Sequence, residues 1–225
     1  MKLIPYHLGL ILDGNRRWAE ERGLPAQEGH RRGSKKLEEL IQWVKERGVK
    51  ILTIFVFSTE NWQRPKREVD FLFGLAKRMV NNSLEKLNRQ KIKVRVIGQR
   101  EKLPESLKTA ITKAEKLTQN NQEMTLNFAL SYGGRAEIVE AIKNIIQKKF
   151  SPDKITEEVI SQNLWTSELD LLIRTGKEQR LSNFLIWQAA YSELYFSQKY
   201  WPDFTEKDLD EALQDFVQRQ RRFGK

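Results

Sequence analysis

The sequence predicts an α/β fold: a single domain over residues 1–225 with a central, mostly parallel sheet of about six strands covered by helices. Short runs of β-branched and aliphatic residues alternate with longer amphipathic stretches along the chain. The apolar runs are unbroken rather than alternating, which is typical of strands buried on both faces. No internal repeat and no Gly/Ser/Pro-rich linker interrupts the 225 residues, a length that suits one sizeable domain.

The elements follow from these patterns in order. The apolar runs predict strands at residues 8–12, 51–57, 94–97, 125–130, 169–173 and 194–196. Amphipathic patterns predict helices at residues 34–47, 69–89, 105–119, 135–148, 157–164 and 206–221, and a short helix is expected to open near residues 15–18. In such folds ligands bind beyond the carboxyl ends of the strands, so the residues that follow each strand are the first place to look for a site.

Composition excludes several classes of protein. The chain has no cysteine, which removes disulfides, thiolate nucleophiles and cysteine-ligated zinc. The N-terminus does not read as a signal peptide, because Pro5, His7 and Gly9 interrupt it and Asp13 closes it early. The longest apolar run, residues 51–57, is far short of the roughly 20 residues that span a bilayer. We therefore expect a cytoplasmic protein, at most peripherally associated with membranes.

The net charge of +10 predicts acidic partners: nucleic acid, an anionic membrane surface or phosphorylated small molecules. Most lysines and arginines lie on helical stretches interleaved with glutamate, a pattern typical of a solvated helix face. The sequence has no zinc-finger spacing, no RNA-recognition signature and no basic tail. Nucleic acid is therefore not expected as a partner.

Polar loops that each contain arginine follow four of the expected strands. They begin with DGNRR at residue 13, STENWQRP at 58, SYGGR at 131 and RTGKEQRLSN at 174. The arginine fork binds two phosphate oxygens at once, and glycine lets the backbone approach a phosphate closely. The spacing matches neither a Walker A loop nor a GxGxxG fingerprint. The four loops together predict a site for a heavily anionic ligand, whereas Gly14 by itself is explained by a tight turn.

A site that displaces a diphosphate normally calls for a divalent metal. Magnesium prefers one or two carboxylates together with phosphate oxygens and water. Asp13, directly after the first strand, is the first candidate. Glu193, at the edge of the last short strand, is the second, although a helix cap or a surface acid is the simpler interpretation on local grounds.

Several motifs in one order resemble the cis-prenyltransferases, the undecaprenyl diphosphate synthase-like family. They span nearly the whole chain, from His7 to Gly224. The motifs are HLGLILDGNRRWA, GH at residues 29–30, FSTENWQRP, LNFALSYGGRAEI, IRTGKEQRLSNFLIWQAAYSELYF, WPDF and RRFG.

The resemblance implies a magnesium-dependent prenyltransferase that condenses isopentenyl diphosphate with an allylic diphosphate. The product would be a Z-configured polyprenyl diphosphate, and the enzyme a homodimer. The resemblance assigns Asp13, Asn15 and Asn61 to catalysis, and Asp13 and Glu193 to Mg²⁺. The implied allylic diphosphate site contains Gly14, Asn15, Arg16, Arg17, Trp18, His30, Ser58, Trp62 and Arg64. The implied isopentenyl diphosphate site contains Arg174, Arg180 and Ser182, with Arg222 and Gly224 reaching a neighbouring subunit's site.

The growing hydrocarbon needs a dry tunnel, and Glu68 is expected to order the loop that closes over the substrates. Candidate tunnel residues on the second strand and the following helix are Ile54, Val56, Phe71, Leu72, Leu75 and Met79, although core packing explains most of them. A proton must also be lost, and its acceptor stays open between a substrate phosphate and the region of Asn15 and Asn61.

The chain departs from the family pattern at a few positions. Ala26 stands where the family usually has an arginine, unless Arg16 or Arg31 takes over that phosphate contact. Lys177 stands where a second glycine is common. Val56 replaces a smaller alanine typical of long-chain members, and Phe128 adds bulk to the following wall. We therefore expect a product of short to medium chain length.

Three other functions compete with regular chain elongation. Because Ala26 stands in place of the usual arginine, one alternative is irregular coupling of dimethylallyl diphosphate units on the same fold. A non-catalytic partner subunit is disfavoured because the DGNRRW and RTG elements are intact. A nucleic-acid-binding module ranks lower still, since no recognised motif accompanies the charge.

Overall fold

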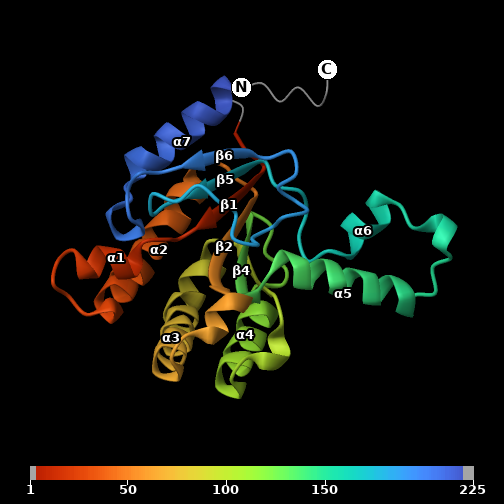
Figure 1. Cartoon of the computed structure of the whole chain (residues 1–225), viewed down its shortest axis with the longest axis horizontal. Coiled ribbons are helices and arrows are strands. Elements are labelled where there is room, and N and C mark those ends of the chain that lie inside the picture. Colours follow the sequence, from red (N-terminus) through yellow and green to blue (C-terminus); the bar gives the residue numbers. More distant parts are fainter. Residues whose placement is uncertain (1–3, 220–225) are drawn as a thin grey trace.

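The computed structural model describes residues 4–219 and centres on one six-stranded sheet (Figure 1). The strands are β1 (His7–Ile11), β2 (Ile51–Ser58), β3 (Ile92–Ile97), β4 (Met124–Tyr132), β5 (Leu171–Arg174) and β6 (Glu193–Phe196). They lie in the order β3-β4-β2-β1-β5-β6, and each neighbouring pair is parallel. The predicted α/β fold is therefore confirmed, with each strand within two residues of its expected bounds.

Seven α-helices connect and cover these strands within the described residues. They are α1 (Asn15–Glu20), α2 (Ala26–Glu46), α3 (Lys66–Arg89), α4 (Glu105–Thr118), α5 (Gly134–Gln147), α6 (Glu157–Asn163) and α7 (Glu206–Gln218). Short 3-10 turns are η1 (Thr59–Gln63), η2 (Arg100–Lys102), η3 (Pro152–Lys154) and η4 (Trp201–Asp203). In Figure 1, α5 and α6 form an arm that extends away from the sheet, and α7 lies beside the β6 edge.

Helix α2 begins eight residues earlier than its predicted start at residue 34. The extra turns contain glycines at positions 29 and 33, and glycine weakens a helix interior by roughly 0.5–1 kcal/mol. The helix instead uses both glycines to approach α1. A Cβ atom at Gly29 would lie 1.9 Å from the backbone oxygen of Asn15, and one at Gly33 would lie 2.1 Å from the Asn15 Oδ1 atom.

The core explains why the strands are unbroken apolar runs. One cluster of buried side chains packs helices α2, α3, α4 and α7 on the sheet, and a second cluster packs segment 181–189 against β1, β4 and β5. Fully buried members include Leu8, Leu10, Leu52, Ile54, Leu126, Leu172 and Phe184. Each such side chain contributes roughly 1.5–3 kcal/mol by leaving water, so both faces of the sheet stabilise the fold.

The strand order also fixes where a site forms. From β1 the chain moves to β2 on one side, whereas β5 pairs with β1 on the other. The order therefore reverses between β1 and β5, and a crevice at such a switch point is the usual ligand site of an open α/β sheet.

Candidate active site

Asp13 and Arg174 meet at the carboxyl ends of β1 and β5. Ile11 lies opposite Arg174 in the pairing of the two strands, which places Asp13 just beyond the end of β5. The Arg174 Nη2 atom donates to Asp13 Oδ2 at 2.8 Å. Thr175 Oγ1 accepts from the Asp13 backbone N–H at 3.0 Å and donates to the Asp13 backbone oxygen at 2.8 Å. These contacts hold the carboxylate of Asp13 in place.

Two glycines with left-handed backbone let the chain turn tightly around Asp13. Gly14 has φ +100°, and its N–H donates to Asp13 Oδ1 at 2.6 Å. A Cβ atom on Gly14 would lie 2.5 Å from the ring of Tyr200. Gly176 has φ +91°, and a Cβ atom there would lie 2.9 Å from the Asp13 carbonyl carbon. A side chain at position 176 would therefore clash with Asp13, and one at position 14 would clash with Tyr200.

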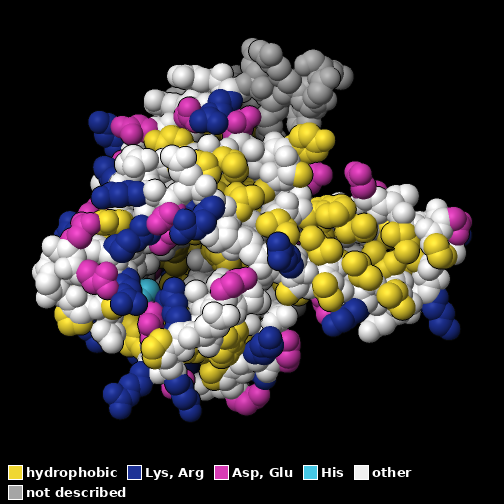
Figure 2. Space-filling view, viewed as in Figure 1, with side chains coloured by type: hydrophobic (Ala, Val, Ile, Leu, Met, Phe, Trp, Pro, Cys, Tyr) yellow, Lys and Arg dark blue, Asp and Glu magenta, His cyan; other side chains and the backbone are white. Residues whose placement is uncertain are grey.

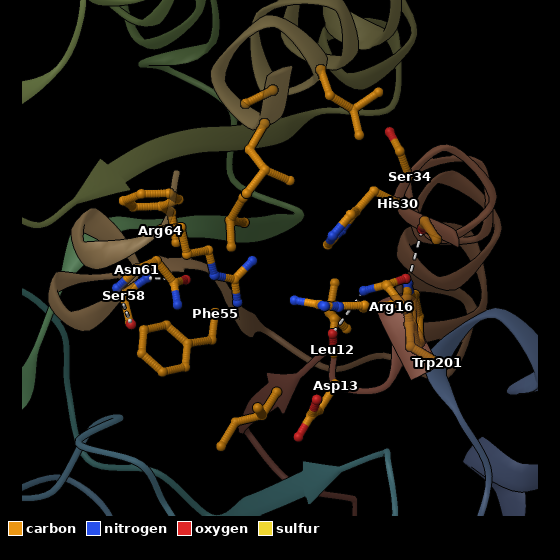
Figure 3. Close-up of a pocket in the computed structure, with 18 of the residues that line it drawn as sticks. Leu12, Asp13, Arg16, His30, Ser34, Phe55, Ser58, Asn61, Arg64 and Trp201 are labelled. Carbon is orange, nitrogen blue, oxygen red and sulfur yellow. Dashed lines mark hydrogen bonds between the residues drawn. The ribbon is translucent and has the colours of Figure 1, made fainter. Parts of the chain in front are cut away.

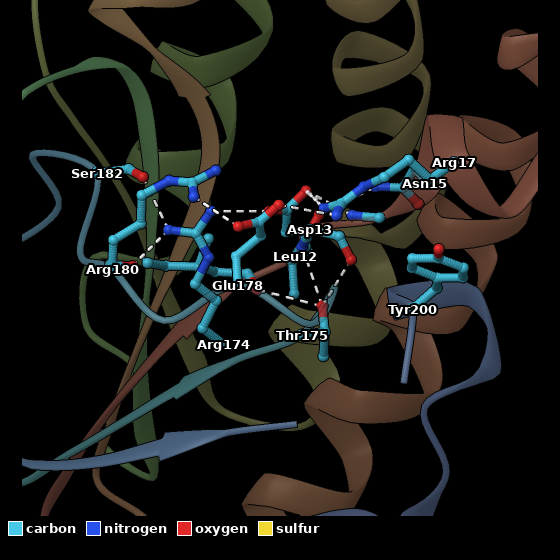
Figure 4. Close-up of polar contacts among 12 residues, drawn as sticks. Leu12, Asp13, Asn15, Arg17, Arg174, Thr175, Glu178, Arg180, Ser182 and Tyr200 are labelled. Carbon is cyan, nitrogen blue, oxygen red and sulfur yellow. Dashed lines mark hydrogen bonds and ion pairs between the residues drawn. The ribbon is translucent and has the colours of Figure 1, made fainter. Parts of the chain in front are cut away.

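Arg17 and Glu178 extend this pair into a chain of alternating charges (Figure 4). Arg17 Nη2 lies 3.0 Å from Asp13 Oδ1, and Arg17 Nη1 donates to Glu178 Oε1 at 3.0 Å. Arg180 Nη1 donates to the other Glu178 oxygen at 2.5 Å. Burial lowers the pKa of Arg17, but the carboxylates of Asp13 and Glu178 outweigh it and raise that pKa above its ordinary value. Arg17 is therefore a permanent cation at the rim.

Arg174 is the buried member of this cluster, only 3% exposed. Besides Asp13, its Nη1 atom donates to Ser182 Oγ at 2.8 Å and to the backbone oxygen of Arg180. The Nε atom has no hydrogen-bond partner among residues 4–219. The guanidinium is thus fixed on two sides while the segment around Ser182 closes over it.

The close packing of α1 on α2 fixes Asn15 and His30. The Asn15 Nδ2 atom donates to the backbone oxygen of Leu12 at 3.0 Å, so its amide braces the turn after β1. His30 follows Gly29 on α2, and its Nε2 atom is buried without a hydrogen-bond partner within residues 4–219. Burial, together with the positive charge of Arg64, lowers the pKa of His30 to about 4, so the ring is neutral at pH 7. Figure 3 shows Arg16, His30 and Arg64 pointing into the same cavity.

The segment after β2 is a capped 3-10 turn. Ser58 Oγ accepts from the Asn61 backbone N–H at 3.2 Å, and Asn61 Oδ1 accepts from the Ser58 N–H at 3.0 Å. Such a reciprocal cap satisfies two backbone donors of the turn. Arg64 then forms an ion pair with Glu68 at 2.9 Å at the start of α3. The cap and the ion pair present Arg64 to the cavity opposite Asp13.

These side chains surround one cavity of about 770 Å³. Its polar rim contains most of the predicted site residues, namely Asp13, Gly14, Asn15, Arg16, Arg17, His30, Ser58, Asn61, Arg64, Glu68, Arg174 and Ser182. Its depth is apolar and is lined by residues that include Leu37, Val56, Leu72, Leu75, Ala76, Met79 and Leu130. Figure 2 shows basic side chains around this hollow. The arrangement suits a molecule with an anionic head and a hydrocarbon tail.

Four of the predicted aromatic and aliphatic residues lie away from the cavity lining, as does the predicted cation Arg180. The Trp18 indole N–H donates to Asp203 at 2.7 Å, and the Trp62 indole N–H donates to Ser131 at 2.9 Å, so both rings brace neighbouring turns. Phe71 lies beneath the guanidinium of Arg31, whose carbon is 5.7 Å from the ring centre. Ile54 is fully buried in the core. These side chains support the walls of the cavity from outside.

Within one chain, Glu193 lies far from Asp13, so its assignment to Mg²⁺ stays a prediction. Glu193 begins β6 opposite Leu171, which in turn lies opposite Leu8 at the amino end of β1. At roughly 3.3 Å per residue, Glu193 lies on the order of 15 Å from Asp13 along the strand direction. Its carboxylate instead pairs with Arg219 at 3.3 Å. Arg222 and Gly224 lie outside the described residues.

The departures from the family pattern have local explanations. Arg31 pairs with Glu28 at 3.3 Å outside the cavity lining, whereas Arg16 lines the cavity, so of these two arginines Arg16 is the one at the site. Lys177 has φ +66°, a conformation that favours glycine. Its ammonium group lies 4.5 Å from the centre of the Tyr200 ring.

Three polar residues of the site belong to the loops that follow the strands, but the sequence assigns them no role. They are Glu60, Glu178 and Asn183. Asn183 Nδ2 donates to Glu60 Oε1 at 3.0 Å, and both side chains line the cavity. Glu178 joins Arg17 to Arg180. Their only sequence signal was their position in loops after the strands, because pairing between distant loops is set by the fold.

The carboxylate of Asp13 fits a magnesium ion that arrives with a phosphate. Among residues 4–219, no cluster of three or more His, Cys, Asp or Glu side chains is arranged to hold a metal ion. Asp13 faces the cavity with its side chain 28% exposed. Magnesium typically takes one or two carboxylates and completes its shell with phosphate oxygens and water, so a single aspartate at a phosphate site suffices.

Helices in the described part of the chain give no candidate membrane span, since none combines the required length with sufficient apolar character.

Comparison with known proteins agrees with this geometry. A family model described as "putative undecaprenyl diphosphate synthase" matches residues 11–224. An isoprenyl transferase from Thermotoga maritima is 47% identical, covering 98% of this chain and 97% of its own. A Pasteurella multocida ditrans,polycis-undecaprenyl-diphosphate synthase, (2E,6E)-farnesyl-diphosphate specific, is 45% identical over 98% of this chain and 95% of its own.

Among solved structures, lavandulyl diphosphate synthase from Lavandula x intermedia, in complex with dimethylallyl diphosphate, superposes with a TM-score of 0.95. It is 40% identical, and the match covers 99% of both chains. With a family model over nearly its whole length and relatives of this identity, the chain belongs to the undecaprenyl diphosphate synthase family of cis-prenyltransferases.

Proposed function

We propose that this chain condenses isopentenyl diphosphate with an allylic diphosphate to give a Z-configured polyprenyl diphosphate. The observation that carries the proposal is the Asp13 carboxylate, held between Arg17 and Arg174 at the polar rim of a cavity with an apolar depth. Two neighbouring diphosphates need several positive charges around them, and a hydrocarbon tail needs an apolar lining that excludes water. Both requirements meet in one cavity.

The allylic diphosphate binds at the Asp13 side of the rim. Gly14 lets the backbone approach its phosphates, and Arg16, Arg17 and Arg64 supply positive charge around the opening. Neutral His30 offers a polar nitrogen at the same wall. The tail then points toward the apolar depth between α2 and α3. The complex of the lavandulyl synthase with dimethylallyl diphosphate supports an allylic ligand on this fold.

The diphosphate of isopentenyl diphosphate binds at the Arg174 side. Arg174 and Ser182 hydrogen-bond one another, and Arg180 adds a cation at the same loop. Glu178 and Asp13 neutralise these arginines when no phosphate is bound. Arriving phosphate oxygens take over the guanidinium donors, a match that the arginine fork favours.

The reaction needs one bond formed, one broken and one proton lost. The double bond of isopentenyl diphosphate attacks the carbon that carries the allylic diphosphate, and the carbon–oxygen bond to that diphosphate breaks. Arg17 stabilises the charge that develops on the leaving group. The amides of Asn15 and Asn61 are engaged in bracing contacts, so we assign proton removal to a phosphate oxygen of isopentenyl diphosphate rather than to either amide.

Magnesium is the proposed cofactor, with Asp13 as its protein ligand. When bound, it neutralises the diphosphate and favours its departure. Asp13 keeps its place through the backbone contacts with Gly14 and Thr175. Chelating the metal is therefore expected to abolish turnover while leaving the fold intact.

We also propose a homodimer that buries the arm formed by α5 and α6. Figure 2 shows apolar side chains gathered on this arm. Its large apolar residues, 38–67% exposed, are Val139, Ile142, Ile146, Phe150 and Ile155. A contiguous exposed patch of this kind marks an interaction site in soluble proteins. In sedimentation experiments, Ile142→Asp should yield monomer, while Leu117→Asp, an equally exposed position on α4, should leave the dimer intact.

The activity is tested by incubating the protein with magnesium, labelled isopentenyl diphosphate and, separately, dimethylallyl, geranyl, farnesyl and geranylgeranyl diphosphates. Mass spectrometry should show a ladder of products spaced by one isoprene unit, ending at a short to medium length, and none after chelation. Product from dimethylallyl diphosphate alone would instead indicate irregular coupling. No product in any arm would overturn the proposed function.

A further inference from the structure

Glu178 lies between two arginines that the proposed function assigns to separate diphosphates (Figure 4). Its Oε1 atom accepts from Arg17 Nη1 at 3.0 Å, and its Oε2 atom accepts from Arg180 Nη1 at 2.5 Å. Arg17 belongs to the proposed allylic side of the rim, and Arg180 belongs to the proposed isopentenyl side. One carboxylate therefore holds a guanidinium group of each side.

The backbone around Glu178 is fixed without help from its side chain. Before it, the Gly176 N–H donates to the Lys199 backbone oxygen at 2.7 Å. After it, the Arg180 backbone oxygen accepts from the buried guanidinium of Arg174. Both contacts use backbone atoms of the loop, so the Glu178 carboxylate can leave its partners without unfolding the loop.

Arg17 is also held independently of Glu178. Its Nη2 atom lies 3.0 Å from Asp13 Oδ1, and its guanidinium carbon lies 5.5 Å from the centre of the Tyr200 ring. Tyr200 is only 8% exposed, and its hydroxyl donates to Glu21 at 2.5 Å. Removing the Glu178 carboxylate should therefore leave Arg17 in place, with its Nη1 donor available to another anion.

Glu178 and a diphosphate compete for the same donors. A carboxylate and a phosphate both accept two parallel N–H bonds from an arginine fork. The Glu178 side chain is 30% exposed and does not line the cavity, whereas Arg17 does, so the carboxylate contacts Arg17 without occupying the cavity. The cluster of Asp13, Arg17, Arg174, Glu178 and Arg180 has three cations and two anions, a net charge of +1. Loss of the Glu178 charge raises it to +2.

We infer that Glu178 is an internal competing anion that promotes the release of inorganic diphosphate after each condensation. The inference rests on the proposed function, because it takes the leaving group of the allylic substrate as the anion bound at Arg17. While that diphosphate is bound, its oxygens take the guanidinium donors and the Glu178 carboxylate turns toward solvent. As the diphosphate leaves, the carboxylate returns to Arg17 and Arg180, so the donors exchange one anion for another and none is left unpaired.

A purely structural role for Glu178 makes the opposite prediction. If its carboxylate served only to join α1 to the loop after β5, its removal would loosen Arg17 and Arg180 and weaken the binding of diphosphate. Removal of a competing anion instead leaves diphosphate more tightly bound. The sign of the change in affinity therefore separates the two roles.

The test measures the binding of inorganic diphosphate, in the presence of magnesium, by isothermal titration calorimetry. Glu178→Gln and Glu178→Ala should each bind it about three- to tenfold more tightly than wild type, as expected for one or two partly exposed ion pairs. Glu28→Gln is the matched control, because it removes the same charge from an ion pair with Arg31 outside the cavity lining. That variant should keep the wild-type affinity. In turnover assays, added diphosphate should inhibit the two Glu178 variants at correspondingly lower concentrations.

The possible outcomes separate the inference from the proposed function. Wild-type protein that binds diphosphate, with equal or weaker binding in both Glu178 variants, would overturn the role of Glu178 alone. An equal gain in affinity in Glu28→Gln would also overturn it, since net charge would then explain the effect. Wild-type protein that binds no diphosphate would overturn the proposed function. Glu178→Ala decides the question if the amide of Glu178→Gln still accepts from the arginines, and circular dichroism checks that each variant is folded.

Discussion

The Arg174 Nη2 atom lies 2.8 Å from Asp13 Oδ2, and this ion pair joins the ends of two neighbouring strands at the topological switch point of the sheet. The arginine side chain is nearly buried, whereas the aspartate faces the cavity. The pair therefore ties the proposed binding loop for isopentenyl diphosphate to the proposed metal and allylic diphosphate loop. In the proposed function, this one contact would position both substrates.

Arg174→Lys should weaken the binding of isopentenyl diphosphate. Lysine keeps the charge but lacks the fork that contacts Asp13, Ser182 and the Arg180 carbonyl together. Loss of one charge-assisted hydrogen bond, worth about 1.5–3 kcal/mol, corresponds to about a ten- to hundredfold fall in kcat/KM. Steady-state kinetics with varied isopentenyl diphosphate measure it. Arg89→Lys, on an exposed turn of α3, is the control, and equal kinetics in both variants would contradict the assignment.

Gly29→Ala should destabilise the protein and impair use of the allylic substrate. The added Cβ atom would lie 1.9 Å from the Asn15 backbone oxygen, so α1 must move away from α2. Gly74→Ala is the matched control inside α3, where the nearest atom to a new Cβ is the end of the Arg78 side chain at 3.7 Å. That change should stabilise by about 0.5–1 kcal/mol through helix propensity. Thermal unfolding compares the two; similar stability of both variants would argue against close α1–α2 packing.

Acid should destabilise the fold through His7. Its ring is buried between Thr53 Oγ1 at 2.7 Å and the Glu168 backbone oxygen at 2.8 Å, and burial lowers its pKa to about 4 from the usual 6.5. Between these two pH values the unfolded chain binds a proton on His7 that the folded chain does not bind. The free energy of unfolding therefore has its full value above about pH 6.5 and falls on acidification. The loss by pH 4 is about 3 kcal/mol at 1.36 kcal/mol per pKa unit.

The measurement is the unfolding free energy in denaturant at several pH values for wild type and His7→Gln. The variant should be less stable at pH 7 but should show a shallower fall toward pH 4. His30, the other histidine, keeps its own contribution to the slope in both proteins. Equal slopes in the two proteins would contradict the burial of a neutral His7.

Val56→Ala should lengthen the product by opening the sheet side of the cavity. Val56 lines that cavity from β2, whereas Leu52 on the same strand is fully buried and does not line it. Mass spectrometry of products from labelled isopentenyl diphosphate compares Val56→Ala with the control Leu52→Val. A product limit that stays at the wild-type value in Val56→Ala would count against the bulk of Val56 as a determinant.

The sheet was readable from the sequence because its strands are buried on both faces, and unbroken apolar runs such as residues 51–57 carry that signal. The start of α2 could not be predicted in the same way, since Gly29 and Gly33 resemble helix breakers until the position of Asn15 is known. Their packing role depends on a contact between two helices, which local propensity does not encode.

The candidate site, too, was predictable from the sequence only in part. Motifs placed Asp13, Arg17 and Arg174 correctly at one rim, because the carboxyl ends of neighbouring parallel strands converge. They also named Glu193, which the register of β6 holds apart from Asp13 within one chain, so its part in metal binding stays a prediction. The contact of Glu178 with Arg17 arises between segments that lie far apart in the sequence. Such contacts appear only once the chain is folded.

The most direct test is the geometry of the double bond formed when this protein, with magnesium, extends an allylic primer by labelled isopentenyl diphosphate. Chromatography and NMR against standards of known configuration assign each new double bond. The account predicts Z geometry at every added unit and no product from dimethylallyl diphosphate alone. New double bonds of E geometry, or no incorporation with any primer, would contradict it.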